Sequence, residues 1–266
     1  MRVDLIDRLM QASGLCIRFF VYCTLMLPAV IVVAASLTAD NTMAFPPAGL
    51  SWRWYSAAVD SPQFMGALWA SVRLASVATC LSMLLGFCSA FAINRYRFPG
   101  RNQFQTLALS PLVVPMVVLG LGLLQFFAWI GLNQSYVGLL IGHTLIMLPY
   151  VVRTLGTGLA LLDRTLEEAA QNLRARPLTV IRKVTLPLML PSLISAAVFA
   201  FVTSFGNVTL SVFLGMTGTV TLPVQIFTYV ESSYDPILAA VSGIVIAVTL
   251  LIILAIERLV GVSRIV

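Results

Sequence analysis

The stretch Glu167–Pro187, EEAAQNLRARPLTVIRKVTLP, is the most polar part of the second half of this chain. It holds four basic and two acidic side chains, and apolar runs of membrane length lie on both sides of it. The whole chain is 59% apolar and only 10% charged, whereas about 25% of the residues in ordinary soluble domains are charged. The composition therefore indicates a membrane protein in which this stretch connects two spans.

Apolar runs long enough to cross a bilayer recur along the chain. A span needs about 20 apolar helical residues, and six runs near that length contain no Asp, Glu, Lys or Arg. The third and fourth runs are divided only by residues 131–135, GLNQS, which form a turn-like cluster. We therefore predict an all-α membrane protein, a single transmembrane domain over residues 1–266, with six helices at residues 19–37, 74–93, 107–130, 136–152, 188–214 and 237–256.

The basic residues indicate which way the chain crosses the bilayer. With the amino terminus in the cytoplasm, 14 of the 16 Lys and Arg residues lie at cytoplasmic positions, and only Arg53 and Arg73 lie on or near the outer side. Cytoplasmic loops carry such an excess, so we expect both termini and the polar stretch to face the cytoplasm. Because the basic residues are dispersed between apolar runs, they do not form a nucleic-acid surface.

Two segments, residues 38–73 and 215–236, are expected on the outer side. Within the second, residues 215–234 are too polar and too broken by glycine to be a span. A short helix, a re-entrant piece and a plain external loop all remain possible there. The aromatic residues of these segments fit an interfacial belt: Trp52, Trp54, Tyr55, Trp69, Tyr229 and Tyr234.

The polar stretch carries helix signals of its own. Thr165 followed by Glu168 is a capping-box pattern that predicts a helix start, and Pro177 ends this helix or opens a second turn, while Pro187 marks the beginning of the fifth span. Helical spacing gives one apolar stripe, with Glu167, Gln171 and Arg174 outside it, made of Leu166, Ala169, Ala170 and Leu173. From periodicity alone, the helix could be a solvated connector that fixes topology or an interfacial helix lying on lipid.

Two short motifs in this stretch resemble a known family. Glu168-Ala169-Ala170, with the later Val184-Thr185-Leu186-Pro187, resembles the EAA loop of permease subunits of ABC importers. The resemblance implies that residues 163–187 form a cytoplasmic loop whose coupling helix docks into a cleft on an ATPase subunit. The coupling residues would be Leu166, Glu167, Glu168, Ala169, Ala170, Leu173 and Arg174.

Arg174 departs from the pattern of this family, which usually has glycine at that position. If the backbone there is left-handed, a residue other than glycine costs roughly 1–2 kcal/mol. Either the turn differs from that of the family, or docking contacts offset the strain.

The resemblance extends over most of the chain. Residues 94–101, NRYRFPGR, 110–115, SPLVVP, and 221–226, TLPVQI, are similar to the second permease of spermidine/putrescine-type importers. This resemblance implies a type I ABC importer permease fold in a bacterial inner membrane. Residues 204–213, SFGNVTLSVF, resemble a segment that carries an acidic pair in many polyamine permeases, but this chain has Gly206 and Asn207 there.

Permeases of this type carry substrate between two homologous subunits, so the path should lie on spans three to five. Asn207 is the best candidate, because lipid cannot satisfy an amide within a span, although a hydrogen bond between helices would also do so. Gln125 is a second amide, for which structural packing is favoured. The other candidates are hydroxyl residues near Asn207, which often bond to their own helix: Thr203, Ser204, Thr209 and Ser211.

Two ionisable residues near the spans have less direct interpretations. His143, the one histidine of the chain, has no nearby acid or cysteine in the sequence and is predicted to have a packing or interfacial role. Arg73 is predicted to snorkel to the outer interface. The alternative for Arg73 is a charge at the external gate for an anionic substrate.

The chain has no GxxxxGK[ST] motif with which to cradle ATP phosphates. We therefore expect a transport subunit that is not an enzyme, has no catalytic or metal-binding residues and holds no cofactor, with ATP and Mg bound by partners. The resemblance implies that these partners are two ATPase subunits, together with a second permease in a heterodimer and a periplasmic solute-binding protein.

Two rival functions remain. An ion-coupled secondary transporter would be expected to place ionisable residues within its spans, and the predicted spans contain none. A membrane scaffold without transport activity would not need the amphipathic helix at 165–174. Polyamines, organophosphonates, ferric iron and small organic anions all remain possible substrates.

Overall fold

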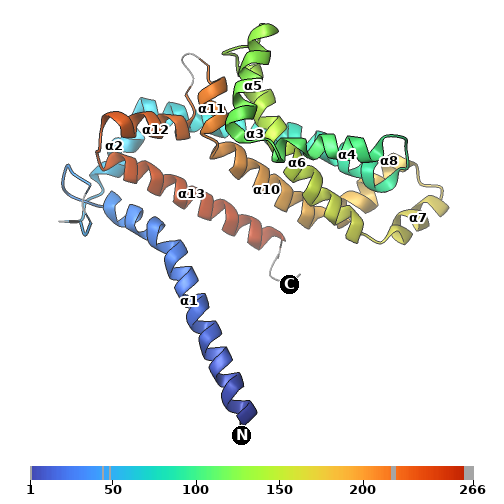
Figure 1. The fold of residues 1–266 in the computed structure, drawn as a ribbon, viewed down its shortest axis with the longest axis horizontal. Coiled ribbons are helices and arrows are strands. Elements are labelled where there is room, and N and C mark those ends of the chain that lie inside the picture. Colours follow the sequence, from blue (N-terminus) through green and yellow to red (C-terminus); the bar gives the residue numbers. More distant parts are fainter. Residues whose placement is uncertain (1, 44, 48, 217–219, 261–266) are drawn as a thin grey trace. The chain divides into compact units, whose positions relative to one another are not determined.

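The computed structural model describes residues 2–43, 45–47, 49–216 and 220–260, and the regular structure within these ranges is helical (Figure 1). The chain divides into two compact units, one of residues 1–65 with 229–253 and one of residues 66–228 with 254–266. The elements are α1 Arg2–Ser36, α2 Arg53–Asp60, α3 Pro62–Arg95, α4 Arg101–Leu109, η1 Ser110–Leu112, α5 Met116–Trp129, α6 Tyr136–Leu161, α7 Arg164–Asn172, α8 Pro177–Val180, η2 Ile181–Thr185, α9 Leu186–Leu188, α10 Leu190–Phe205, α11 Thr209–Leu214, α12 Leu222–Ser232 and α13 Ile237–Val260.

The first unit is built around the contacts of Tyr55 on α2. Its hydroxyl lies 2.7 Å from Ser36 Oγ at the end of α1. On α13, a Cβ at Gly243 would lie 2.5 Å from the same hydroxyl, so the absent side chain lets this helix approach closely. The rings of Phe64 and Tyr229 pack with their centroids 5.3 Å apart. These contacts hold α1, α2 and α13 together within this unit.

The second unit is organised around α6. One face of this helix carries Met147, Val151, Leu155 and Leu159, all fully buried. α10 packs along α6, while α11 packs against both α5 and α6, as Figure 1 shows in the middle of the ribbon. Because α6 is central to its unit, 56% of its apolar window is buried by protein, and both candidate sites described below adjoin it.

The predicted third span, residues 107–130, is bent rather than straight. α4 and η1 meet α5 at an angle of 104°. Pro115 has φ −55° and ψ 133°, which is an extended conformation, and proline has no N–H with which to continue a helix. The predicted span therefore contains a bend, for which the prolines of SPLVVP are the signal in the sequence.

The predicted fifth span, residues 188–214, is interrupted twice. The helical stretch Pro177–Leu188 meets α10 at 75° next to Met189, where Pro191 cannot donate a helical hydrogen bond to the carbonyl of Pro187. A second break follows at Gly206, after which α11 begins at Thr209. The predicted span thus consists of α10 and α11 with a break between them.

By length and composition, α1 (from Met10), α3 and α6 can each cross a membrane, and the two bent pairs raise the number to five. α13 adds a shorter apolar stretch, Ile237–Leu251, among the described residues. All six predicted apolar runs thus have helical counterparts. Within the segment 215–234, residues Leu222–Ser232 form the helix α12, so these residues are not a plain loop.

Candidate functional site

The 163–187 segment folds into α7, α8, the π-helical turn η2 and α9. Its first helix is capped by Asp163, whose Oδ1 accepts the Thr165 N–H at 2.9 Å. This bond lowers the pKa of the Asp163 carboxyl, because it stabilises the ionised form. The predicted cap at Thr165 was therefore wrong by two residues. The Thr165 N–H belongs to the first turn of the helix, where backbone N–H groups have no partner within the helix.

Arg174 ends α7 in the left-handed conformation, with φ +60°. The Arg174 N–H donates to Gln171 O at 2.8 Å and the Ala175 N–H to Ala170 O at 3.2 Å, the two bonds of a Schellman cap. The backbone geometry that usually calls for glycine is thus present with arginine in that place. The conditional strain of roughly 1–2 kcal/mol therefore applies to this chain.

An ordinary amphipathic helix buries its apolar side chains and exposes its charged ones, whereas α7 exposes its leucines and buries a glutamate. Leu166 and Leu173 of the apolar stripe are 46% and 85% exposed, and Ala169 and Glu168 are exposed as well. The buried side of α7 instead carries Glu167, which is only 7% exposed. An apolar stripe left open beside a buried charge is a surface suited to contact with another protein.

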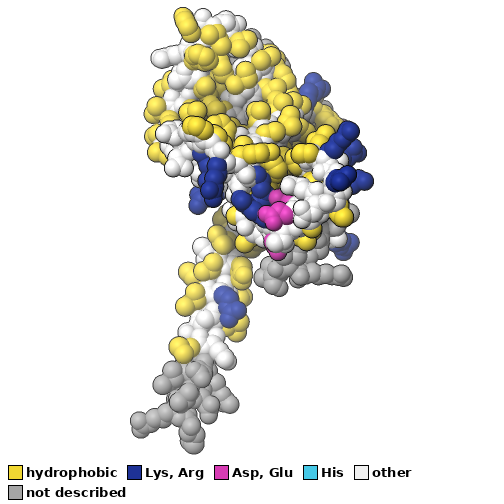
Figure 2. Space-filling view, turned by 90° about the vertical axis from the view of Figure 1, so that its right-hand side faces the viewer, with side chains coloured by type: hydrophobic (Ala, Val, Ile, Leu, Met, Phe, Trp, Pro, Cys, Tyr) yellow, Lys and Arg dark blue, Asp and Glu magenta, His cyan; other side chains and the backbone are white. Residues whose placement is uncertain are grey.

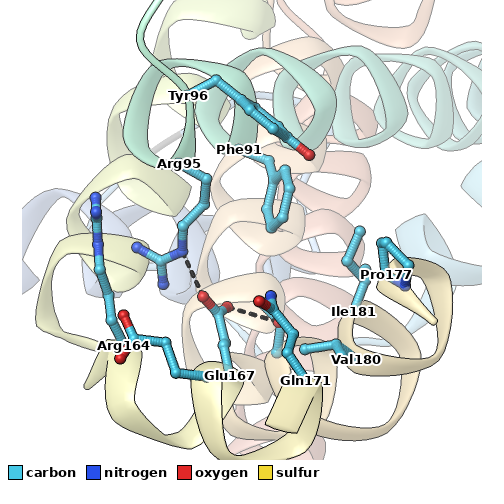
Figure 3. A pocket seen from close by; sticks show the side chains of 11 residues that line it. Phe91, Arg95, Tyr96, Arg164, Glu167, Gln171, Pro177, Val180 and Ile181 are labelled. Carbon is cyan, nitrogen blue, oxygen red and sulfur yellow. Dashed lines mark hydrogen bonds and ion pairs between the residues drawn. The ribbon is translucent and has the colours of Figure 1, made fainter. Parts of the chain in front are cut away.

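Glu167 joins three parts of the second unit (Figure 3). Its Oε2 lies 2.7 Å from Nε of Arg95 at the end of α3, and its Oε1 accepts the hydroxyl of Thr185 in η2 at 2.7 Å. The Arg95 guanidinium also donates through Nη1 to Leu159 O, near the end of α6, at 3.1 Å. Both charged side chains are about 9% exposed. We call Arg95, Glu167 and Thr185 the clamp.

A cavity of about 210 Å³ lies beside the clamp. Figure 3 shows Phe91 and Tyr96 on one side of it and Pro177, Val180 and Ile181 on the other. Arg164 also lines the cavity and donates to the Asn94 carbonyl, so the start of α7 is tied to the end of α3. The remaining lining residues are Arg95, Glu167, Glu168, Gln171 and Thr185.

The surface over α7 and α8 is basic. Figure 2 shows Lys and Arg side chains gathered around a small acidic patch at the end of the molecule that carries these helices in Figure 1. Exposed basic residues of the segment are Arg164, Arg174, Arg176, Arg182 and Lys183.

The candidate substrate-path residues lie elsewhere in the second unit, mostly at the break between α10 and α11. Asn207 uses its side chain there as a helix cap, since its Oδ1 accepts the Leu210 N–H at 2.8 Å. Thr203 and Thr209 are half-buried close to it in the chain, and Ser204 is buried. Gln125 lies apart from these residues, exposed on α5.

His143 on α6 bridges this break. Its Nδ1 lies 2.9 Å from Ser204 Oγ on α10, and its Nε2 lies 3.2 Å from Ser211 Oγ on α11. Ser211 already donates its hydroxyl to Asn207 O at 2.8 Å, so it accepts from Nε2–H, and Ser204 donates to Nδ1. His143 is fully buried, which agrees with the predicted packing role. We call His143, Ser204 and Ser211 the histidine bridge.

The comparisons with known proteins agree with this arrangement. Residues 82–261 match the family model described as "Binding-protein-dependent transport system inner membrane component". The chain is 32% identical over 232 residues to the spermidine/putrescine transport system permease protein PotC of Haemophilus influenzae, covering 87% of this chain and 90% of that protein. It is 31% identical over 206 residues to the putrescine transport system permease protein PotI of Escherichia coli K12, covering 75% and 73%.

The fold is similar to that of a chain in the crystal structure of a bacterial ABC transporter involved in the import of the acidic polysaccharide alginate. The TM-score is 0.69 at 16% sequence identity, with 96% of each chain covered. That identity shows a shared fold, while the family match covers more than half of the sequence. The chain therefore belongs to the family of binding-protein-dependent transport system inner membrane components, as a multi-pass permease subunit of an ABC importer.

Proposed function

We propose that this chain forms half of the translocation path of an ATP-driven importer, for a small solute delivered by a periplasmic binding protein. The observation that carries the proposal is the orientation of α7, which leaves Leu166 and Leu173 exposed while Glu167 is buried. A helix that turns its apolar stripe outward in a polar segment has a docking face. We assign this face to a cytoplasmic ATPase subunit.

The energy for transport comes from partners in this proposal. Two ATPase subunits bind ATP and Mg and close on nucleotide, and the 163–187 segment passes their motion to the spans. This chain holds no cofactor and catalyses no reaction. Both termini face the cytoplasm, in keeping with the excess of Lys and Arg on that side.

A second permease completes the path in a heterodimer. The exposed face of α5 supports such a contact, since it carries the apolar side chains of Val117, Leu121 and Phe126 beside the amide of Gln125. Gln125 and the residues at the α10–α11 break, Thr203, Ser204, Asn207 and Thr209, are our candidates for lining the path. An amide on an apolar helix face needs a protein or water partner.

The solute is of the polyamine type, an organophosphonate or a related small molecule. PotC and PotI support the polyamine type through their names. Neutral Gly206 and Asn207 leave room for the other classes. Ion-coupled secondary transport is the less favoured alternative, because the predicted spans have no ionisable side chain to bind a coupling ion.

The test is purification of the complex from its native membrane through an affinity tag on this chain. We expect a subunit with a nucleotide-binding P-loop to co-purify, and Glu168→Lys to abolish ATP-dependent uptake while the complex stays assembled. Glu231→Lys, at another exposed glutamate on α12, is the matched control and should leave both assembly and ATP-dependent uptake unchanged. Recovery of the chain without any ATPase subunit would contradict the proposal.

A further inference from the structure

The clamp gathers elements that are distant in the sequence around one carboxylate. Arg95 ends α3, Glu167 is in the middle of α7, and Thr185 closes the π-helical turn η2. Through Arg95 Nη1 the cluster also reaches Leu159 on α6. Motion of α7 relative to any of these elements would therefore break a bond to Glu167 or Arg95.

Burial makes the clamp more than an incidental surface pair. Exposed ion pairs contribute about 0–1 kcal/mol, but Arg95 and Glu167 are both about nine-tenths buried. Removing one partner of such a pair leaves an uncompensated charge away from water, which is strongly unfavourable. Both oxygens of Glu167 are engaged, one by the guanidinium and one by the Thr185 hydroxyl. The carboxylate is thus held in one position.

The covalent connections of α7 do not by themselves hold it in place. α7 follows α6 after the extended residue Leu162, and it is joined to α8 by residues 173–176, which include the left-handed Arg174. Such connections allow a short helix to pivot. The clamp instead fixes α7 to the ends of α3 and α6 and to η2, the turn that leads into α10 through the bend at Met189.

We propose that Glu167 is a positioning residue that makes α7, η2 and the adjacent ends of α3 and α6 move as one rigid body. This inference rests on the proposed function. When a docked ATPase displaces α7, the clamp makes the spans follow. Without the clamp, the bond from Arg164 to the Asn94 carbonyl still holds the start of α7. The rest of the helix can then swing separately, and part of the displacement is lost before it reaches α10.

The experiment measures this rigidity directly by electron–electron double resonance. Nitroxides are placed at Asn172→Cys on α7 and Thr157→Cys on α6, both exposed positions, in a background whose four cysteines are replaced by alanine. The purified complex is measured without nucleotide and after trapping with ATP and vanadate. We expect one narrow distance distribution that trapping leaves unchanged.

Glu167→Gln should make this distribution about twofold broader or dependent on trapping. Thr185→Val, which removes one hydrogen bond and no charge, should have a smaller effect in the same direction, and Thr185→Ser should restore the narrow distribution. Glu231→Gln on α12 is the control with the same chemical change. If Glu167→Gln does not assemble, Thr185→Val and Thr185→Ser decide.

A narrow distribution, independent of trapping, in both Glu167→Gln and Thr185→Val overturns the inference. So does a broad distribution in the protein without these changes. Failure of the proposed function is recognised separately, because the chain would then bring down no ATPase subunit and vanadate would trap no nucleotide. The distance measurement without nucleotide still tests the clamp in that case.

Discussion

The second unit contains two buried polar clusters that perform the same structural task with different chemistry. The clamp joins α3 to α7 and η2 through a charged pair beside a cavity of about 210 Å³. The histidine bridge joins α6 to α10 and α11 through uncharged groups, around a fully buried ring. Each cluster lies where a regular α-helix is interrupted, at η2 for the clamp and between α10 and α11 for the histidine bridge. At such a place, backbone hydrogen bonds do not fix the angle between the two helical pieces.

The difference shows how location selects the chemistry of such a support. In the histidine bridge, one ring donor and one ring acceptor meet two hydroxyls, so no charge has to be buried among the spans. At the clamp, an open cavity adjoins the pair, and an arginine can bind a carboxylate and a carbonyl together. Charged groups bind more strongly there, and the loss of one partner is correspondingly more damaging.

Removal of the clamp arginine should have the largest effect. Arg95→Leu leaves the Glu167 carboxylate buried without its cation, and we expect it to lower the free energy of unfolding by about 3 kcal/mol. Chemical denaturation of the purified subunit in detergent micelles measures this change. Because Arg95→Leu with Glu167→Leu leaves no unpaired charge, the double variant should recover most of the loss; a double variant as unstable as Arg95→Leu would contradict this explanation.

Removal of the histidine ring should have an intermediate effect. His143→Leu leaves Ser204 and Ser211 without their shared partner, and two lost hydrogen bonds lower the unfolding free energy by about 2 kcal/mol. His143→Gln retains a donor and an acceptor and should lose less in the same denaturation measurement. Equal stability of His143→Leu and the unchanged chain would show that the bridge does not stabilise the break.

The C-terminal end of α7 should matter less than the clamp and with the opposite sign. Arg174→Gly relieves a left-handed arginine and should raise the unfolding free energy by about 1 kcal/mol. Arg176→Gly is the matched control, because Arg176 has an ordinary φ of −65° and glycine there only adds freedom to the unfolded chain. A larger loss of stability in Arg174→Gly than in Arg176→Gly would mean that the Arg174 side chain has contacts that outweigh its strain.

The N-terminal end of α7 should show the smallest effect, seen locally as a pH dependence. The pKa of Asp163 is lowered by its bond to the Thr165 N–H, so its capping contribution is present above the ordinary carboxyl pKa of about 3.9. The contribution is lost as the pH falls through the lowered value. Hydrogen exchange at the Thr165 amide measures this, and Asp163→Asn, which keeps an acceptor but does not titrate, should abolish the pH dependence. Unchanged pH dependence in that variant would assign it to another group.

The features that the sequence predicted are those encoded by neighbouring residues. Apolar runs located the helices, and the polar stretch between them became α7 to α9. From the sequence, Arg174 stands where the family usually has glycine, and the open question was whether the backbone there is left-handed. It is, with φ +60°. The bends at Pro115 and Met189 were also locally encoded, by prolines whose effect on the adjoining spans was underestimated.

The clamp could not be predicted in the same way. Arg95 and Glu167 are far apart in the sequence, and each had a satisfactory separate explanation, one as a topology charge and the other as part of a polar helix face. Only the packing of α3 against the 163–187 segment brings them to 2.7 Å. The sequence did not identify Asp163 as the cap of α7, because Thr165 is also a common cap residue. Which of the two caps the helix depends on the backbone conformation at residues 163–165.

The exposed leucines of α7 also affect how the subunit is produced. Leu173 is 85% exposed and Leu178, after the turn, is 75% exposed. A subunit made in excess of the partner that covers these leucines therefore exposes an apolar surface. Such a surface favours self-association and recognition by quality-control proteases. Balanced synthesis of the subunit and its covering partner would then determine how much intact protein accumulates in the membrane.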